Sequence, residues 1–246
     1  MSDQSTTSRV LYQVENGVAE ISLNRPENIN AFDMSMRDDM FMVLRLFRDD
    51  PDARVGIVNG RGEKGFCAGA DLKEFGTTPS LVASRSIRWE RDIWGLLSSI
   101  EKPIIASLHG YVIGTGIEIA ALCDIRIASH DALFRMPEVA LGMIPAAGGT
   151  QTIARTIGVV ATMDMIMTSR EVTAQDALQM RLVDRVVSSK SLNNVTESLA
   201  LDLSGMDIKA LKAIKMAAKM GIDHSLQRGL DLEMRVARKL LETIES

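Results

Sequence analysis

The stretch "PIIASLHGYVIGTGIEIAALCDIRIAS", residues 103–129, combines two strand patterns with a helix pattern between them. We predict strands at "PIIASLHG" and "DIRIAS", and a helix from about Gly116 to Cys123. Strands separated by a helix pair in parallel through a right-handed crossover, because a parallel connection needs a dozen or more residues. The stretch therefore indicates an α/β fold.

The segments on either side extend this pattern. "VLYQVENGVAEISLN" alternates apolar and polar residues around Asn16-Gly17, which predicts a β-hairpin. We expect a helix from Asp33 that ends before Pro51, and a buried strand at "VGIVNG". Further helices are expected at 81–100, "GGTQTIARTIG", "VATMDMIMT" and "AQDALQM", followed by a strand at "LVDRVVS". After about residue 189 only helical patterns occur, and their surplus apolar positions predict subunit association.

The composition favours a globular protein over several other classes. Of the 246 residues, 46% are apolar and 24% are charged, so a large core can form. The net charge of −4 and the scattered basic residues argue against a nucleic-acid surface. The two cysteines form no disulfide framework, which fits a reducing cytoplasm, and we expect no signal peptide and no membrane span. The three histidines show no metal-ligand spacing, so no metal is predicted.

The glycine-rich turn "GFCAGADLKEF", residues 65–75, could bring a ligand close to backbone N–H groups. The helix that follows would present unpaired donors and a partial positive charge. The alternative is a tight connection between a strand and a helix that binds nothing. The turn alone does not decide between the two.

Two glutamates occur in apolar surroundings. Glu118 lies in the first turn of "GIEIAALC", and Glu138 follows a proline in "LFRMPEVALGMIPAAGGTQ", residues 133–151. A carboxylate in such a place is paired, exposed or kept protonated by burial. The alternative for Glu118 is that it complements the helix dipole, and a Pro-Glu pair is ordinary. Together, the turns and the glutamates fit acid–base chemistry beside a carbonyl group, although spacing does not show that they converge.

Several segments, in order along the chain, resemble the enoyl-CoA hydratase/isomerase family, also called the crotonase superfamily. They are "LNRPENINAF" (23–32), "GFCAGADLKEF" (65–75), "KPIIASLHGYVIGTGIEIAALCDIRIAS" (102–129), "FRMPEVALGMIPAAGGTQ" (134–151) and "MTSREVTAQDALQMRLVDRVV" (167–187). The resemblance implies a crotonase-type spiral of ββα units over residues 1–188, which carries an acyl-CoA site. It also implies a helical region over residues 189–246 that assembles trimers or hexamers, without the family's usual final tail.

The resemblance also implies roles for individual residues. The N–H groups of Ala70 and Thr115 would hold the thioester oxygen, and Glu118 and Glu138 would hold a water molecule and transfer protons. Residues that would contact CoA are Lys64, Ala68, Asp71, Leu72 and Lys73. CoA would be part of the substrate, so no separate cofactor is expected, and neither is a nucleic-acid or membrane partner.

Three departures from the family pattern concern the site. Thr115 replaces a glycine that is common there, Ala146 stands where glycine is common beside the catalytic water, and Glu27 occupies an often basic position. Because both glutamates are present, hydration of a 2-enoyl-CoA is the favoured reaction. The alternatives are an enoyl-CoA isomerase and a homologue that binds acyl-CoA without turnover. Residues between about 75 and 94 would shape the acyl pocket.

Overall fold

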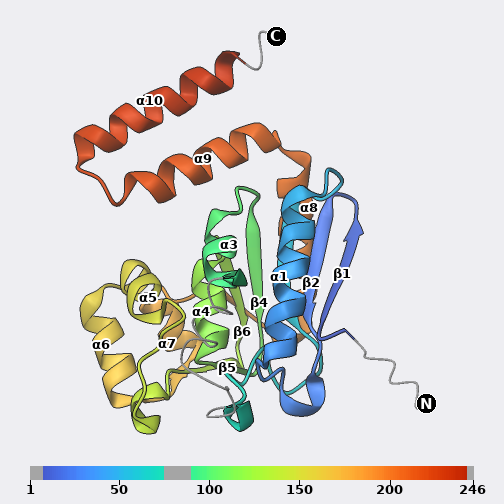
Figure 1. Cartoon of the computed structure of the whole chain (residues 1–246), viewed down its shortest axis with the longest axis vertical. Helices are drawn as coiled ribbons and strands as arrows, with labels where there is room; N and C mark the ends of the chain where they lie inside the picture. Colours follow the sequence, from blue (N-terminus) through green and yellow to red (C-terminus); the bar gives the residue numbers. More distant parts are fainter. Residues whose placement is uncertain (1–7, 75–89, 243–246) are drawn as a thin grey trace.

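The computed structural model describes residues 8–74 and 90–242, and its main feature is a six-stranded sheet (Figure 1). The strands are β1 (Val10–Glu15), β2 (Val18–Leu23), β3 (Val55–Gly60), β4 (Ile104–Leu108), β6 (Ile125–Ser129) and β9 (Arg185–Val187). β1 pairs antiparallel with β2, and the later pairs are all parallel. The order of the strands in the sheet follows their order in the chain, as expected of a spiral.

A second, three-stranded sheet completes the spiral. It consists of β5 (Tyr111–Ile113), β7 (Leu133–Arg135) and β8 (Val172–Thr173). β4, β5 and the helix α4 (Thr115–Leu122) form one ββα unit, and β6 and β7 add to it in parallel, β6 on β4 and β7 on β5. The prediction from the residues missed this sheet, because strands of two or three residues are too short to show an alternating pattern.

The first hairpin and the first helix confirm their predictions. Asn16 and Gly17 have φ angles of 51° and 80°, which the type I′ turn of a two-residue hairpin requires. Helix α1 (Met34–Asp49) begins where Asp33 accepts a hydrogen bond from the Met36 N–H at 2.7 Å. The apolar residues on one face of α1, Met36, Met40, Leu44 and Phe47, are fully buried.

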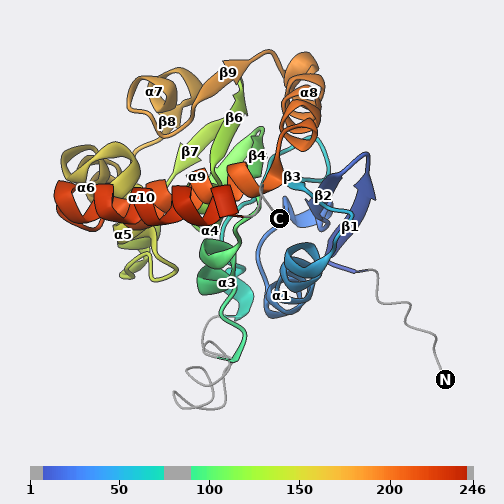
Figure 2. The same cartoon turned by 90° about the horizontal axis from the view of Figure 1, so that it is seen from above.

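Helices cover both faces of the main sheet (Figure 2). Helices α1, α3 (Ile93–Ser99) and α4 lie on one face, and α8 (Leu192–Gly205) lies on the other. Neighbouring strand residues point to opposite faces, so Ile104 packs toward α1, α3 and α4, whereas Ile105 packs toward α8. Burial of each such side chain stabilises the fold by roughly 1.5–3 kcal/mol. α3 is shorter than the helix predicted over 81–100, of which residues 81–89 lie outside the described ranges.

Short helices complete one end of the molecule. Helices α5 (Gly149–Ile157), α6 (Val159–Thr168) and α7 (Ala174–Gln179) lie together there (Figure 1). The 3-10 turns are η1 (Pro26–Asn28), η2 (Leu72–Glu74), η3 (Glu138–Leu141) and η4 (Ser189–Ser191). The predicted strand "LVDRVVS" is shorter than expected, since only Arg185–Val187 pairs as a strand. No helix within 8–74 or 90–242 is long and apolar enough to cross a membrane.

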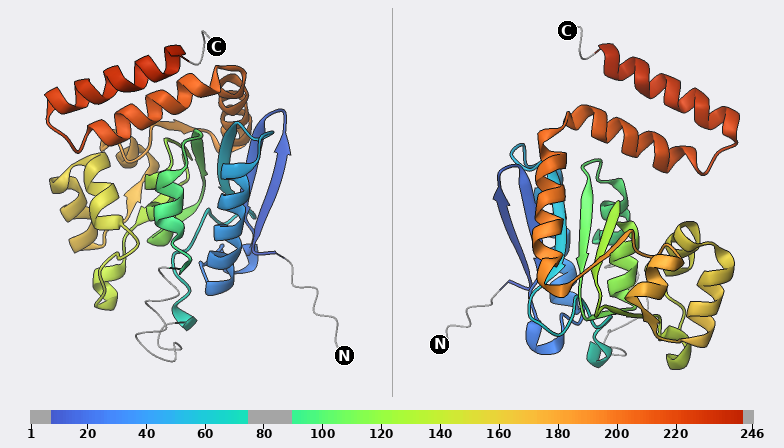
Figure 3. Two further views of the ribbon diagram at one scale, coloured as in Figure 1. Left: turned by 45° about the horizontal axis from the view of Figure 1, so that its top comes forward. Right: turned by 180° about the vertical axis from the view of Figure 1, so that it is seen from behind.

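The last two helices form an arm that extends across the molecule. α9 (Ile208–Gly221) is followed by α10 (Leu226–Glu242), which lies on the side of α9 away from the sheet (Figures 1 and 3). Lys215 and Lys219 attach α9 to the core through the two carboxylate oxygens of Asp124, at 2.7 and 2.9 Å. α8 packs on the sheet while α9 and α10 form the arm, and the predicted boundary at residue 188 stays a prediction.

Candidate active site

A cavity of about 780 Å³ opens where the glycine-rich turn, the start of α4 and the segment from η3 to α5 meet. Its lining includes most of the residues that the sequence singled out. These are Ala68, Ala70, Asp71, Leu72, Thr115, Glu118 and Glu138. Residues as far apart in the chain as Ala68 and Glu138, 70 positions, therefore line one cavity.

Two turns lie side by side in the wall of this cavity. The N–H of Cys67 donates to the Tyr111 carbonyl at 3.0 Å, and the N–H of Ile113 donates back to the Cys67 carbonyl at 2.9 Å. This pairing places residues 68–70 alongside the start of α4. A Cβ atom at Gly114 would lie only 3.9 Å from the Cα atom of Gly69.

The residues that follow these glycines are Ala70 and Thr115. Thr115 is the first residue of α4, so its N–H has no acceptor within the helix, and the helix dipole adds positive charge there. Within residues 8–74 and 90–242, neither the Ala70 N–H nor the Thr115 N–H donates a hydrogen bond to the protein. Both residues line the cavity, so their N–H groups are candidates to donate to an acceptor on a bound molecule.

Glu118 is held by the start of α5. The side chain is 3% exposed, and its Oε1 atom accepts hydrogen bonds from the N–H groups of Ala147 and Gly149, both at 3.0 Å. A Cβ atom at Gly149 would lie 2.9 Å from this oxygen, so the close approach depends on glycine. Two N–H donors on one oxygen suit an ionised carboxylate, which only accepts hydrogen bonds.

Glu138 has a contrasting environment at the start of η3. Burial raises the pKa of its carboxyl group above the usual value. Its Oε2 atom is buried and has no hydrogen-bond partner in the part of the chain that the structure describes. Its Oε1 atom lies 2.7 Å from the position that a Cβ atom at Gly114 would occupy. Glu138 is therefore suited to carry a proton beside the start of α4.

An aromatic pair lies in the same cavity. The ring centroids of Phe32 and Trp94 are 6.2 Å apart, and Leu141, Met143 and Ile144 add further apolar surface. The sequence predicts that residues between about 75 and 94 shape the acyl pocket. Residues 75–89 lie outside the described ranges, and Trp94 lines the cavity. Phe32 was missed, although the "NAF" in which it occurs belongs to a segment that carries the resemblance.

The residues expected to contact CoA differ in their positions. Lys64 and Lys73 are exposed and are not among the residues that line the cavity. The carboxylate of Asp71 accepts hydrogen bonds from Arg25 at 2.6 Å and from the Lys73 N–H at 3.1 Å. The hydrogen bond from Arg25 holds the pKa of the Asp71 carboxyl group below its usual value. The Asp71 side chain thus contacts the protein, and its N–H donates to the Phe32 carbonyl at 3.0 Å.

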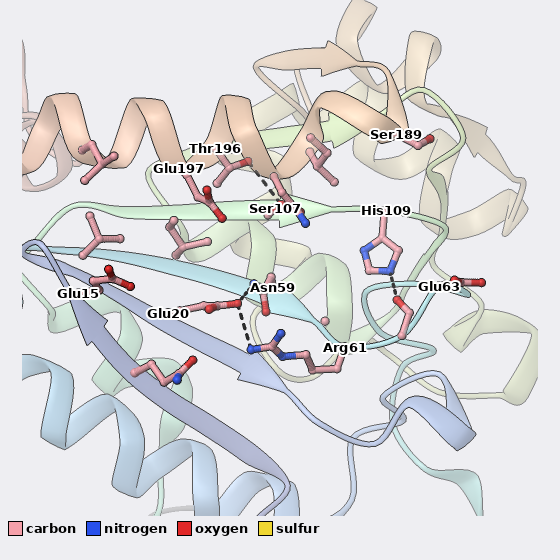
Figure 4. Close-up of a pocket in the computed structure, with 18 of the residues that line it drawn as sticks. Glu15, Glu20, Asn59, Arg61, Glu63, Ser107, His109, Ser189, Thr196 and Glu197 are labelled. Atoms are coloured by element: carbon pink, nitrogen blue, oxygen red, sulfur yellow. Dashed lines mark hydrogen bonds and ion pairs between the residues drawn. The ribbon is translucent and has the colours of Figure 1, made fainter.

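A second cavity, of about 800 Å³, lies between the main sheet and α8 (Figure 4). Asn59 donates to the Glu20 carboxylate at 2.7 Å, and Arg61 lies 3.3 Å from the same oxygen. Neither Glu118 nor Glu138 lines this cavity. The groups that the sequence assigned to acid–base chemistry therefore belong to the first cavity. In the described ranges, no three His, Cys, Asp or Glu side chains form a group that could hold a metal ion.

Comparisons with known proteins agree with the architecture of the fold. The model of the family described as "Enoyl-CoA hydratase/isomerase" matches residues 13–246. (E)-Benzylidenesuccinyl-CoA hydratase of Thauera aromatica is 36% identical over 223 residues, which are 90% of this chain and 86% of that protein. Short-chain-enoyl-CoA hydratase of Clostridium acetobutylicum is 33% identical over 226 residues, 92% of this chain and 87% of that protein.

Solved structures give the same result. A crystal structure of enoyl-CoA hydratase from Bacillus anthracis superimposes with a TM-score of 0.90 at 31% identity, covering 95% of this chain and 91% of that chain. A Thermobifida fusca protein, solved in complex with CoA, superimposes with a TM-score of 0.88 at 28% identity, covering 97% of this chain and 95% of that chain. The chain therefore belongs to the enoyl-CoA hydratase/isomerase family and has the crotonase fold.

Proposed function

We propose that the protein is an enoyl-CoA hydratase, which adds water syn across the 2,3 double bond of a 2-enoyl-CoA thioester. The observation that carries this proposal is the unequal pair of glutamates in one cavity. Glu118 accepts two backbone N–H bonds, whereas Glu138 is half-buried and its buried Oε2 atom has no hydrogen-bond partner in the described chain. Two carboxyl groups with such different surroundings can divide base and acid work at neutral pH.

The N–H groups of Ala70 and Thr115 are the proposed oxyanion hole. They would donate to the thioester oxygen, on which negative charge develops when a nucleophile adds at C3. Each such donor contributes about 3 kcal/mol to transition-state stabilisation in enzymes of this kind of chemistry. The position of Thr115 at the start of α4 adds the partial positive charge of the helix.

The glutamates would then move the protons. Water held between them loses one proton to the Glu118 carboxylate while its oxygen bonds to C3, and the π electrons move to the thioester oxygen as an enolate. Protonated Glu138 gives its proton to C2, and the enolate returns to a thioester. The product is a 3-hydroxyacyl-CoA, and exchange with solvent restores both carboxyl groups. Positioned acid–base groups of this kind contribute about 10²–10⁴-fold to the rate.

CoA would bind across the mouth of the cavity. Ala68, Asp71 and Leu72 border the cavity, and Lys64 and Lys73, which are not among its lining residues, are exposed, so that phosphates could reach them. CoA enters as part of the substrate, so the proposed reaction needs no further cofactor. Phe32 and Trp94 suit a bulky or aromatic acyl group, in line with the name of the Thauera aromatica relative.

The proposal is tested by following the ultraviolet absorbance of a conjugated enoyl thioester. Crotonyl-CoA and cinnamoyl-CoA represent small and aromatic acyl groups. We expect the absorbance of at least one to fall on addition of enzyme, with formation of the 3-hydroxyacyl-CoA by mass spectrometry. Glu118→Gln and Glu138→Gln should each lower kcat by about 10²–10⁴-fold. If neither enoyl-CoA gains water, although both bind in calorimetry, the chain is a binding protein and the proposal fails.

Double-bond isomerisation is the second candidate. The observation that favours it is the buried, unpartnered Oε2 atom of Glu138, since a single carboxyl group could shuttle a proton between C2 and C4. An isomerase would convert a 3-enoyl-CoA into a 2-enoyl-CoA without adding water. It would also keep activity in Glu118→Gln and lose it in Glu138→Gln. A hydratase should lose activity in both variants.

We further propose that the arm formed by α9 and α10 assembles a trimer or a hexamer. Ile214, Met220, Leu226, Leu230 and Leu241 are exposed on these helices, and such patches occur at subunit interfaces. Light scattering of the purified protein should give three or six times the 26.9 kDa of the chain, and a monomer would refute the proposal. The cytoplasm stays the predicted location, in keeping with the two buried free thiols.

A further inference from the structure

Arg25 lies behind the glycine-rich turn, between β2 and α1. Its side chain is 12% exposed. The NH1 atom donates to the Asp71 carboxylate at 2.6 Å and to the Ala31 carbonyl at 3.1 Å, and lies 3.3 Å from the Asp33 carboxylate. Arg25 thus connects the segment before α1 with the residue that directly follows Ala70.

The same segment contacts the turn at several points between Gly65 and Asp71. The N–H of Phe32 donates to the Gly69 carbonyl at 2.8 Å, and the N–H of Asp71 donates to the Phe32 carbonyl at 3.0 Å. The Asn30 side chain, which is fully buried, donates to the carbonyls of Gly65 and Phe66, both at 3.1 Å. These bonds hold the backbone of the turn against the segment before α1.

Arg25 also balances the negative charge of two aspartates, Asp33 and Asp71. Asp33 and Asp71 have side chains that are 9% and 10% exposed, and Arg25 is within 3.3 Å of both. The next cation, Arg9, reaches Asp33 only at 4.0 Å. Without Arg25, two nearly buried carboxylates would face each other with little compensation, and their repulsion would push Asp71 outward. Because Ala70 directly precedes Asp71, the N–H of Ala70 would change its direction when Asp71 moves.

We propose that Arg25 is a positioning residue for the oxyanion hole, and that it aims the Ala70 N–H by holding Asp71 in place. This inference rests on the proposed function, since it concerns the same two N–H donors. Arg25 does not line the cavity and would not contact the substrate. Its effect should therefore appear in the polarisation of the thioester carbonyl and in kcat, and hardly in KM.

The test uses butyryl-CoA labelled with ¹³C at the thioester carbonyl. This saturated compound cannot be hydrated, so its carbonyl stretch can be recorded on the full-length protein by infrared difference spectroscopy. In the wild type, two donors should lower the stretching frequency on binding. Arg25→Met should lose much of this shift and lower kcat by about 10- to 100-fold, because misdirection of one donor costs most of its contribution. Arg25→Lys should restore part of both.

Asp71→Asn and the double variant show whether Arg25 acts through Asp71. If it does, Asp71→Asn should lose a similar part of the shift, and Arg25→Met should add little to it in the double variant. Because Arg25→Met could fail to fold, Arg25→Lys and Asp71→Asn carry the test in that case. Arg126→Met is the matched control, since Arg126 is a similarly buried arginine, 3.1 Å from Asp184, that does not line the cavity.

The outcomes separate this inference from the proposed function. A wild type that binds butyryl-CoA without any shift would refute the oxyanion hole itself. A wild-type shift that stays complete in Arg25→Met, or in both Arg25→Lys and Asp71→Asn, would overturn the role of Arg25. An equal loss of the shift in Arg126→Met would also overturn it, because the effect would then reflect general loosening of the fold.

Discussion

Gly114 lies between the proposed oxyanion hole and Glu138. A methyl group added at Gly114 should therefore displace the carboxyl group of Glu138, which is the proposed proton donor. A Cβ atom at this position would lie 2.7 Å from Oε1 of Glu138, about 0.7 Å inside ordinary van der Waals contact. In Gly114→Ala the carboxyl group therefore has to move by a large part of an ångström. Since a misplacement of about 1 Å can cost 10²-fold, we expect kcat to fall by about 10- to 100-fold.

The same substitution also strains the backbone. Gly114 has φ 47° and ψ −110°, a conformation that residues with a side chain rarely adopt. Strain of this kind costs about 1–3 kcal/mol, which should appear as a lower free energy of unfolding in urea. Loss of stability and loss of activity must therefore be separated, and kcat should be measured at a temperature where the variant is fully folded.

Gly158→Ala provides the matched control. Gly158 has φ 82° and ψ 158°, so alanine is strained there too, but a Cβ atom would meet nothing within 4 Å. Gly158 connects α5 to α6 and does not line the cavity. We expect it to lose stability by a similar amount and to keep the wild-type kcat. If Gly114→Ala also keeps the wild-type kcat, the reasoning that Glu138 acts from this position is wrong.

Two further predictions follow from buried charges. Burial raises the pKa of Glu138 in the folded state, so the unfolded chain ionises first as the pH rises and stability is lost above the unfolded pKa. Glu138→Gln should therefore lose hydratase activity. Its free energy of unfolding, measured by urea titration, should exceed that of the wild type at pH 8 and not at pH 4. The same difference from the wild type at both pH values would contradict this prediction. Lys215→Met leaves Asp124 without its closest cation, at 2.7 Å. Lys215→Met should lower the free energy of unfolding in urea by about 2 kcal/mol, whereas the control Lys209→Met on the same helix should lower it little. Equal losses in the two variants would show that the ion pair does not attach α9.

The sequence predicted the elements whose structure depends on a local pattern of residues. Alternation around Asn16-Gly17 predicted the hairpin, and Asp33 with the following apolar spacing predicted α1, because turn and cap geometry depend on neighbouring residues alone. Glu118 and Glu138 were recognisable because a carboxylate is out of place among apolar residues. Only the resemblance predicted that the two glutamates lie in a single cavity, since residue spacing contains no information on tertiary contacts.

The features that were missed arise from contacts between distant segments. The amide groups that hold Glu118 come from residues 147 and 149, and no pattern near position 118 indicates them. In the same way, Arg25 looks like an ordinary loop residue until the fold brings Asp71 within 2.6 Å of it. The residue pattern alone did not show the repeat of ββα units, which only the resemblance implied, because strand pairing repeats along the spiral whereas the residues do not.

The pairing of the two turns has a consequence for how the protein is made on the ribosome. The glycine-rich turn is translated early, but it depends on hydrogen bonds with Tyr111 and Ile113, and Glu118 waits for Gly149. A nascent chain that has folded only the first strands of the sheet would therefore contain an incomplete pocket. All the segments that line this pocket are present only when about three fifths of the polypeptide has left the exit tunnel, so shorter translation products would lack a complete pocket.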